Sequence, residues 1–234
     1  MAITKTNRTS LATSTDAAAF TTNSYTPSAN MILIATVGNT KGTTPDAVNT
    51  FTDGLGLTWN LIHTVVDNGD LRRITQYWAN SGASPAATTA TADFNGVNQT
   101  ACYIHITEYD GLDLTDPIGD TDVQNPAATG LTLSIAITMA STSNGCYVAI
   151  GSTGTPTADA TLSATNCQQI AVPTLSSPTQ SLYLGWDSVN QTAPGFTWQT
   201  NSRTRWGAGF ELVAAAGSVV GQSTSNRTTR RRRR

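Results

Sequence analysis

The stretch from Leu57 to Ala79, LTWNLIHTVVDNGDLRRITQYWA, decides the fold, because it has the pattern of a β-hairpin. Apolar and polar residues alternate on both sides of Asn68-Gly69. This dipeptide favours a type I′ turn, because both of its positions need positive φ. Folding about the turn fixes which residues lie opposite one another. The expected pairs are Trp59 with Trp78, Leu61 with Gln76, and His63 with Ile74.

The predicted hairpin has one apolar and one polar face, as in an antiparallel sheet with one side in solvent. His63 falls on the apolar face, so a hydrogen-bonded core histidine is favoured over a metal ligand or a general base. Gln76 is the polar exception on the apolar face, and Ile62 is the apolar exception on the other. The apolar face carries Leu57, Trp59, Leu61, His63, Val65, Ile74 and Trp78, and the polar face carries Thr58, Asn60, Thr64, Arg73, Thr75 and Tyr77.

The rest of the chain favours an all-β protein. Charged residues make up only 12% of it, about half the usual share, and threonine, which suits the solvent face of a strand, is very common. Residues 31–37 are apolar on both faces, like a central strand, and residues 102–109 and 131–140 alternate. Short strands separated by Gly and Asn turns predict a two-sheet antiparallel β-sandwich. Long connections at 38–56 and 110–130 suit crossovers between sheets, so we expect a jelly-roll-like sandwich.

Three segments are expected along the chain: an extended N-terminal arm over 1–16, a β-sandwich domain over 17–214, and a linker with a basic tail over 215–234. Six of the 13 basic residues lie in the last eight positions, which leaves seven basic and 15 acidic residues elsewhere. A strongly basic end on an acidic body suggests a charged partner for the tail, and a solvated end is the alternative. The candidate partner-binding residues are Arg227, Arg230, Arg231, Arg232, Arg233 and Arg234.

The three cysteines are interpreted as buried thiols in a chain made in a reducing compartment. Their number is odd and none forms a C-x-x-C pair; one disulfide plus one free thiol is the alternative. The N-terminus lacks the apolar segment of a signal peptide. No stretch is apolar enough to span a membrane, so no membrane partner is expected. The cysteines are Cys102, Cys146 and Cys167.

Two groups of residues are candidate binding sites. Asp110, Asp113 and Asp116 offer hard oxygen ligands for a cation such as Ca²⁺, although their spacing matches no EF-hand and a solvated loop is favoured. Trp198 and Trp206 flank the polar run QTNSRTR and are candidate glycan contacts, whereas packing in the core is the default for the other tryptophans.

No catalytic site is expected. His105 falls on the opposite side of its strand from the isoleucines at 104 and 106, so it is predicted to lie at the surface. No nucleophile elbow, zinc-protease, P-loop or dinucleotide-binding motif is present. We therefore expect no enzyme activity, no catalytic residue, no cofactor and no bound metal.

Three stretches resemble β-sandwich domains of tailed-phage structural proteins and of some bacterial surface proteins. They are TDGLGLTWNLIHTVVDNGDLRRITQYWANSGASPAATTATADF, YIHITEYDGLDLTDPIG and GFTWQTNSRTRWGAGFELV. The shared frame is Gly-Leu-Thr-Trp at 56–59, an Arg-bearing strand over 72–79, and Glu-Tyr-Asp-Gly at 108–111. The resemblance implies a virion or surface role and no catalytic residues.

We therefore expect a virion structural protein of a tailed phage, assembled in the host cytoplasm. A capsid decoration (cement) protein that stabilises neighbouring subunits through its termini is the first hypothesis, and a tail or fibre component is close to it. The expected partners are other virion proteins and further copies of the chain, with nucleic acid reached only through the Arg tail. A carbohydrate-binding or receptor-binding adhesin is the alternative; an extracellular filament subunit and an enzyme such as a depolymerase are further ones.

Overall fold

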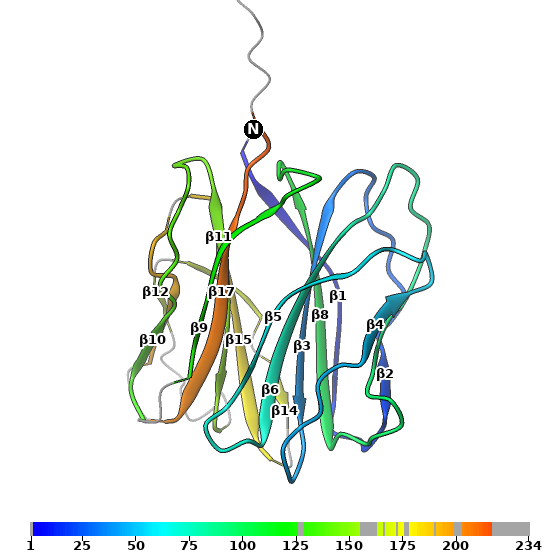
Figure 1. The fold of residues 1–234 in the computed structure, drawn as a ribbon, viewed down its shortest axis with the longest axis vertical. Helices are drawn as coiled ribbons and strands as arrows, with labels where there is room; N and C mark the ends of the chain where they lie inside the picture. Colours follow the sequence, from blue (N-terminus) through cyan, green and yellow to red (C-terminus); the bar gives the residue numbers. More distant parts are fainter. Residues whose placement is uncertain are drawn as a thin grey trace, which may run out of the picture.

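Four antiparallel β-sheets are stacked face to face in the computed structural model of the chain (Figure 1). The structure describes residues 2–125, 129–154, 163–165, 167–171, 173–175, 178–189, 191–198 and 203–216. Two large sheets form the middle of the stack, and a three-stranded sheet covers the outer face of each. The expected all-β sandwich is therefore confirmed, with an additional layer on both sides.

The first half of the chain forms one large sheet and its cover. The N-terminal sheet has the order β1 (Thr4–Thr13), β8 (Ala101–Asp110), β3 (Ile32–Thr40), β6 (Arg72–Asn80), β5 (Asn60–Val66). The N-terminal cover has the order β2 (Ala19–Thr21), β7 (Ala90–Asp93), β4 (Thr50–Asp53).

The second half forms the other pair of layers. The C-terminal sheet has the order β13 (Gln168–Ala171), β15 (Gln180–Asp187), β11 (Gly145–Ser152), β17 (Arg205–Leu212), β9 (Ile118–Gln124), and β14 (Thr174–Leu175) also pairs with β15. The C-terminal cover has the order β10 (Thr132–Ser134), β16 (Gly195–Thr197), β12 (Ser163–Thr165).

The chain passes between the two large sheets once, through residues 111–117 that join β8 to β9. Within each half, strands from its two ends alternate in the interleaved order of a jelly roll: β1-β8-β3-β6 faces β2-β7-β4, and β9-β17-β11-β15 faces β10-β16-β12. The connection at 41–49 leads from the N-terminal sheet to its own cover and not to the opposite large sheet. The strand order is therefore that of the expected jelly roll, but it occurs twice, once in each half of the chain, whereas a single sandwich was expected.

Three hydrophobic cores fill the spaces between the four layers. The central core, between the two large sheets, contains Ile34, Tyr103, Tyr147, Leu184, Trp206 and Phe210 among others. The N-terminal core lies under the N-terminal cover and includes Phe20, Phe51, Tyr77 and Ile104. The C-terminal core lies under the C-terminal cover and includes Leu133, Ile135, Phe196 and Trp198. Because β3 has a core on each face, all nine of its residues are buried, as the two-sided apolar pattern predicted.

The β5–β6 hairpin forms, but its turn and register differ from the prediction. The Asp70 amide bonds to the Asp67 carbonyl at 3.0 Å, and Asp70, rather than Asn68-Gly69, adopts positive φ (50°). The buried Asp67 carboxylate fixes this wider turn by accepting the amides of Leu71 and Arg72 and the guanidinium of Arg72. A bulge between Leu61 and His63 shifts the register again. The resulting pairs are Asn60 with Trp78, Leu61 with Tyr77, His63 with Gln76, and Val65 with Ile74.

The predicted division of the hairpin into a wet and a dry face is wrong, because the N-terminal core covers the second face of β6. Trp78 packs against the central core, whereas Trp59 packs against the N-terminal core. Tyr77, expected in solvent, stacks on Phe51 with ring centroids 5.0 Å apart. Leu61, expected in the core, is 57% exposed.

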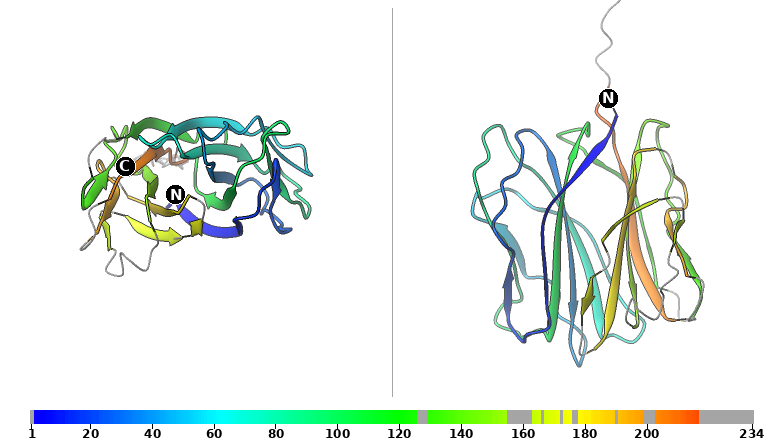
Figure 2. Two further views of the ribbon diagram at one scale, coloured as in Figure 1. Left: turned by 90° about the horizontal axis from the view of Figure 1, so that it is seen from below. Right: turned by 180° about the vertical axis from the view of Figure 1, so that it is seen from behind.

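The prediction that residues 1–16 form an extended arm is wrong for most of this segment, because Thr4–Thr13 is the edge strand β1. Its bulge places Arg8 against the buried carboxylate of Glu108, which bonds to Arg8 Nε at 2.9 Å and to the Ser28 amide at 2.6 Å. The two large sheets also meet along their edges: β1 lies beside β14, and β5 lies beside β9 (Figure 2). These contacts give each edge strand of the N-terminal sheet, β1 and β5, a neighbour in the C-terminal sheet.

Candidate functional site

The first and last described residues lie side by side at one end of the stack, above the ends of β8 and β17 (Figure 1). Gly111, at φ 80°, lies between these two ends of the chain. A Cβ at this position would lie 2.7 Å from the Ala2 carbonyl oxygen, so only glycine fits. The Gly111 carbonyl accepts the Ala215 amide at 2.8 Å. We call this end the terminal pole and define it as residues 2–3, 110–120, 138–145 and 211–216.

A buried carboxylate fixes the segment that leaves the last strand. Glu211, 1% exposed, accepts the Ala140 amide and Asn144 Nδ2 on Oε1, each at 2.6 Å. Its Oε2 accepts the Asp120 amide at 3.3 Å. Asn144 Oδ1 in turn accepts the Ala214 amide at 3.0 Å. Because these bonds connect three segments, the chain that leads towards residue 217 starts from a rigid base.

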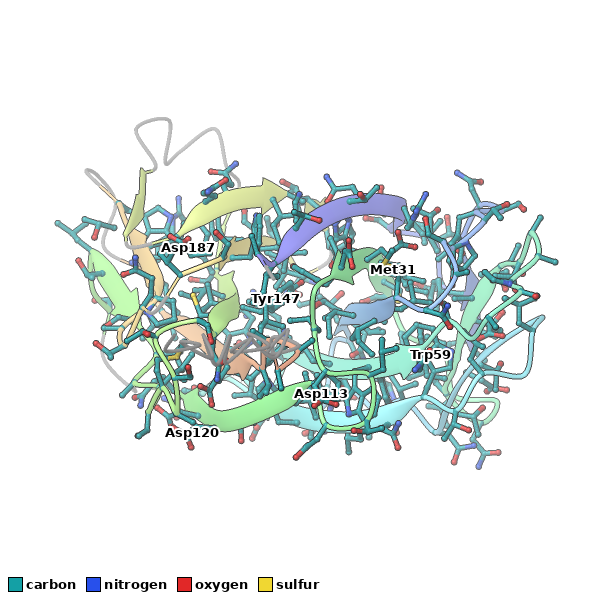
Figure 3. All side chains as sticks on the ribbon, turned by 90° about the horizontal axis from the view of Figure 1, so that it is seen from above. Met31, Trp59, Asp113, Asp120, Tyr147 and Asp187 are labelled. Carbon is teal, nitrogen blue, oxygen red and sulfur yellow. The ribbon has the colours of Figure 1, made fainter. Side chains whose placement is uncertain are left out.

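The terminal pole is rich in carboxylates. Figure 3, which views the molecule from this end, shows Asp113 and Asp120 on the rim and Tyr147 in the middle between the layers. Of the seven basic residues in the described ranges, five belong to the opposite ends of the strands or to loops there. Of the other two, Arg8 is paired with Glu108, and Lys5, which lies opposite Tyr109 next to the pole, donates to Asn7 Oδ1. The pole is therefore acidic. Its carboxylates are Asp110, Asp113, Asp116, Asp120 and the buried Glu211, and Asp187 lies beside it, opposite Cys146.

The candidate cation loop is arranged as a turn. Asp113 Oδ1 accepts the Thr115 amide at 2.8 Å, its hydroxyl at 2.7 Å and the Asp116 amide at 3.1 Å. These bonds lower the pKa of Asp113, and the bond from the Thr115 hydroxyl has the largest effect. Asp110 Oδ1 accepts the Gly111 amide. Within the ranges that the structure describes, no three His, Cys, Asp or Glu residues are grouped to hold a metal ion.

His63 is half-buried beside the central core and is hydrogen-bonded, which agrees with the predicted structural role. Its Nε2 bonds to Gln76 Oε1, and Gln76 Nε2 donates to the Thr36 hydroxyl at 3.4 Å. Thr36 is bonded to the Tyr147 hydroxyl at 2.8 Å. This polar chain crosses from the N-terminal sheet to the C-terminal sheet. Burial lowers the pKa of His63, which favours the neutral ring.

The prediction that His105 lies at the surface is wrong. It is 4% exposed, because the C-terminal sheet covers this face of β8. Its ring stacks on Tyr103 with centroids 6.0 Å apart. Burial, with a smaller effect from Lys5, lowers its pKa to about 4.

The prediction that Trp198 and Trp206 contact glycans is also wrong, because they are 1% and 0% exposed. Trp198 lies in the C-terminal core, with the Arg205 guanidinium 3.9 Å above its ring. Trp206 lies in the central core, close to Arg72. The polar run between them suggested exposure, but the sheets cover both rings.

All three cysteines are free thiols, as predicted. Cys102 and Cys146 are buried, and Cys167 is partly buried. Burial raises the pKa of Cys146 to about 12 and that of Cys167 to about 11, so the reactive thiolate is disfavoured.

The candidate Arg residues of the tail, Arg227 and Arg230 to Arg234, lie outside the described residues, which end at Ala216. Sequence reasoning missed the groups that build the base of this tail. Glu211 and Asn144 belong to no recognisable sequence motif. Their role depends on contacts between segments far apart in the chain.

Comparison with protein-family models, with curated proteins and with solved structures found no match to this chain. In the described ranges, the structure has no helix of the length and apolarity needed to cross a membrane.

Proposed function

We propose that this chain is a virion structural protein of a tailed phage, of the capsid decoration (cement) type. The single observation that carries the proposal is the terminal pole: both ends of the domain leave it side by side, and the exit of the C-terminal segment is fixed by Glu211 and Asn144. A domain held through its two ends at one pole projects away from the surface to which the ends attach. This geometry suits a decoration protein.

The layers supply the rigidity that such a role needs. Each sheet is packed on at least one face, and both large sheets are packed on two. The buried carboxylates of Asp67, Glu108 and Glu211 each accept several hydrogen bonds between separate segments or across a turn. Such networks oppose local opening, because breaking one bond leaves a buried group unpaired.

The Arg tail supplies the attachment in this proposal. Six guanidinium groups can bind carboxylates or phosphates in pairs of hydrogen bonds. Weak contacts that recur on a symmetric particle, made by an oligomeric protein, add up to strong attachment. The burial of Trp198 and Trp206 removes the aromatic side chains that the glycan-binding alternative would have used.

The test is attachment to virions that lack the protein. The full chain, a chain lacking residues 222–234, and a full-length chain with the six tail arginines replaced by serine are each mixed with such particles and sedimented. We expect both altered chains to lose most of their binding while their urea unfolding curves stay unchanged. Full decoration by the truncated chain at high salt would refute the attachment role of the tail.

A further inference from the structure

Both histidines of the chain lie beside the central core, between the two large sheets. His105 alternates along β8 with Tyr103 and Tyr109, which belong to that core. The His63 ring is 5.8 Å from the ring of Phe210, another central-core residue. The N-terminal and C-terminal cores contain no histidine: they consist of apolar side chains and thiols, with the Arg205 guanidinium over Trp198 in the C-terminal core. Groups that titrate near neutral pH are therefore confined to the joint between the two halves of the chain.

Neither ring is prepared to carry a positive charge. Both ring nitrogens of His105 are buried without a hydrogen-bond partner, and so is Nδ1 of His63. The charged group that acts on His105 is Lys5 of β1, which repels a protonated ring. The neighbouring strand β14 contributes only Thr174 and Leu175.

His63 is in a milder position. Gln76 Oε1 of β6 accepts a hydrogen bond from His63 Nε2, the Phe210 ring of β17 is neutral, and Asp122 of β9 attracts a protonated ring. Burial nevertheless outweighs both favourable influences, so that the pKa of His63 is lowered. Proton uptake by either ring is thus easier when the central core is open to water.

The connectivity allows the two halves to separate. The N-terminal sheet and its cover come from residues before 111, and the C-terminal sheet and its cover come from residues after 117. Only one connection joins the two pairs of layers, so they can part without unthreading a strand. Each pair would keep its own hydrophobic core.

We propose that the central core is an acid-sensitive joint: protonation of His105 and His63 parts the two large sheets while each sheet keeps its own cover. The open state takes up protons near pH 6.5, the ordinary pKa of histidine, whereas closed His105 takes one up only near pH 4. The open state is therefore favoured as the pH falls through this interval. Linkage gives up to about a tenfold increase in the opening constant per pH unit for each histidine that is protonated only on opening.

The test uses buried thiols as reporters in the full-length chain. Ala208, 0% exposed in the central core, is replaced by cysteine. Native Cys102 in the N-terminal core and Cys146 in the C-terminal core are matched internal controls. Each thiol is labelled with 4,4′-dithiodipyridine between pH 7 and pH 4.5 and quantified by peptide mass spectrometry. Rates are divided by that of glutathione at the same pH, to remove the titration of the thiol itself.

We expect the normalised labelling of Cys at 208 to rise by up to about tenfold per pH unit per histidine below pH 6.5, while Cys102 and Cys146 stay protected. In the His63→Gln/His105→Gln background the rise should be absent. Equal labelling of all three thiols, or no change at position 208, would overturn the proposal. In the unmodified protein, the two histidine ring signals followed by NMR must titrate well below pH 6.5; a midpoint near 6.5 for His105 would overturn it as well.

Discussion

Thr36 and Tyr147 join the two large sheets through a hydrogen bond of 2.8 Å between their hydroxyl oxygens. Thr36 belongs to the middle strand of one sheet and Tyr147 to the middle strand of the other. Both are fully buried, and Gln76 Nε2 also reaches the Thr36 hydroxyl. The bond thus sets the position of one sheet over the other within an otherwise largely apolar core.

Replacing Thr36 by valine should destabilise the protein by about 1–3 kcal/mol, because the Tyr147 hydroxyl and the Gln76 amide lose a buried partner. The double variant Thr36→Val/Tyr147→Phe should regain part of this loss, since one unpaired hydroxyl is then removed. Urea unfolding measures both. Additive losses in the double variant would show that the two hydroxyls are not coupled.

Replacing Glu211 by glutamine should cost about 1–3 kcal/mol and increase hydrogen exchange at Ala140. A carboxamide has only one acceptor oxygen, whereas Glu211 accepts from Ala140 and Asn144 on one oxygen and from Asp120 on the other. Asp116→Asn, on the exposed part of the same pole, is the matched control and should stay within about 0.5 kcal/mol of the original chain. Equal effects of the two substitutions would contradict the anchoring role of Glu211.

Replacing Arg8 by alanine should cost roughly 3 kcal/mol, the lower end of the range for breaking a buried ion pair, because the Arg8 side chain is 22% exposed. Arg8→Lys should recover part of this loss, since an ammonium cannot reproduce the two-fold contact. Thermal unfolding at neutral pH measures the difference. An alanine variant as stable as the original chain would show that Glu108 is satisfied without Arg8.

The Arg8–Glu108 ion pair also makes the stability of the protein depend on pH. Burial alone would raise the pKa of Glu108, but the bonds from Arg8 and Ser28 outweigh it, so that the pKa is lowered. A carboxyl group with a lowered pKa stabilises the folded state above its unfolded pKa, and this contribution is lost as the pH falls through the folded value. The stability difference between the original chain and Arg8→Ala should therefore shrink below about pH 4.5. A difference that is constant down to pH 3 would contradict this cause.

Replacing Gly151 by alanine should destabilise the fold by about 1–3 kcal/mol or more, as overpacking does. An added Cβ would overlap the Trp206 ring, which lies flat on this part of β11. Gly42→Ala is the matched control, because a Cβ there meets nothing within 4 Å. Urea unfolding compares the two, and a stable Gly151→Ala protein would show that Trp206 can move.

The sequence predicted those elements whose pattern is local. β3 was evident because it is apolar on both faces, and β8 was evident because its residues alternate. The hairpin was found, but its register was not, since the Asp67 carboxylate and the bulge at residue 62 determine it. The strand expected over 131–140 is assigned only over Thr132–Ser134, although Ile135 and Ile137 continue to bond to the segment before β16.

The covers and the terminal pole could not be predicted, because they depend on contacts between distant segments. His105 was placed at the surface for this reason: its own strand gives no sign that the C-terminal sheet lies over it. Trp198 and Trp206 were misplaced in the same way. The terminal pole depends on Gly111, Asn144 and Glu211, which come together from three parts of the chain.

The most direct test of the proposed role is a three-dimensional reconstruction of a particle that carries the protein. We predict that the terminal pole, with Ala2, Gly111 and Ala215, faces the particle and that the β5–β6 turn at residues 67–71 points into solvent. The density of the C-terminal tail should continue from Ala216 onto a neighbouring subunit. A domain bound through residues 67–71, with the terminal pole exposed and the tail touching nothing, would contradict the account.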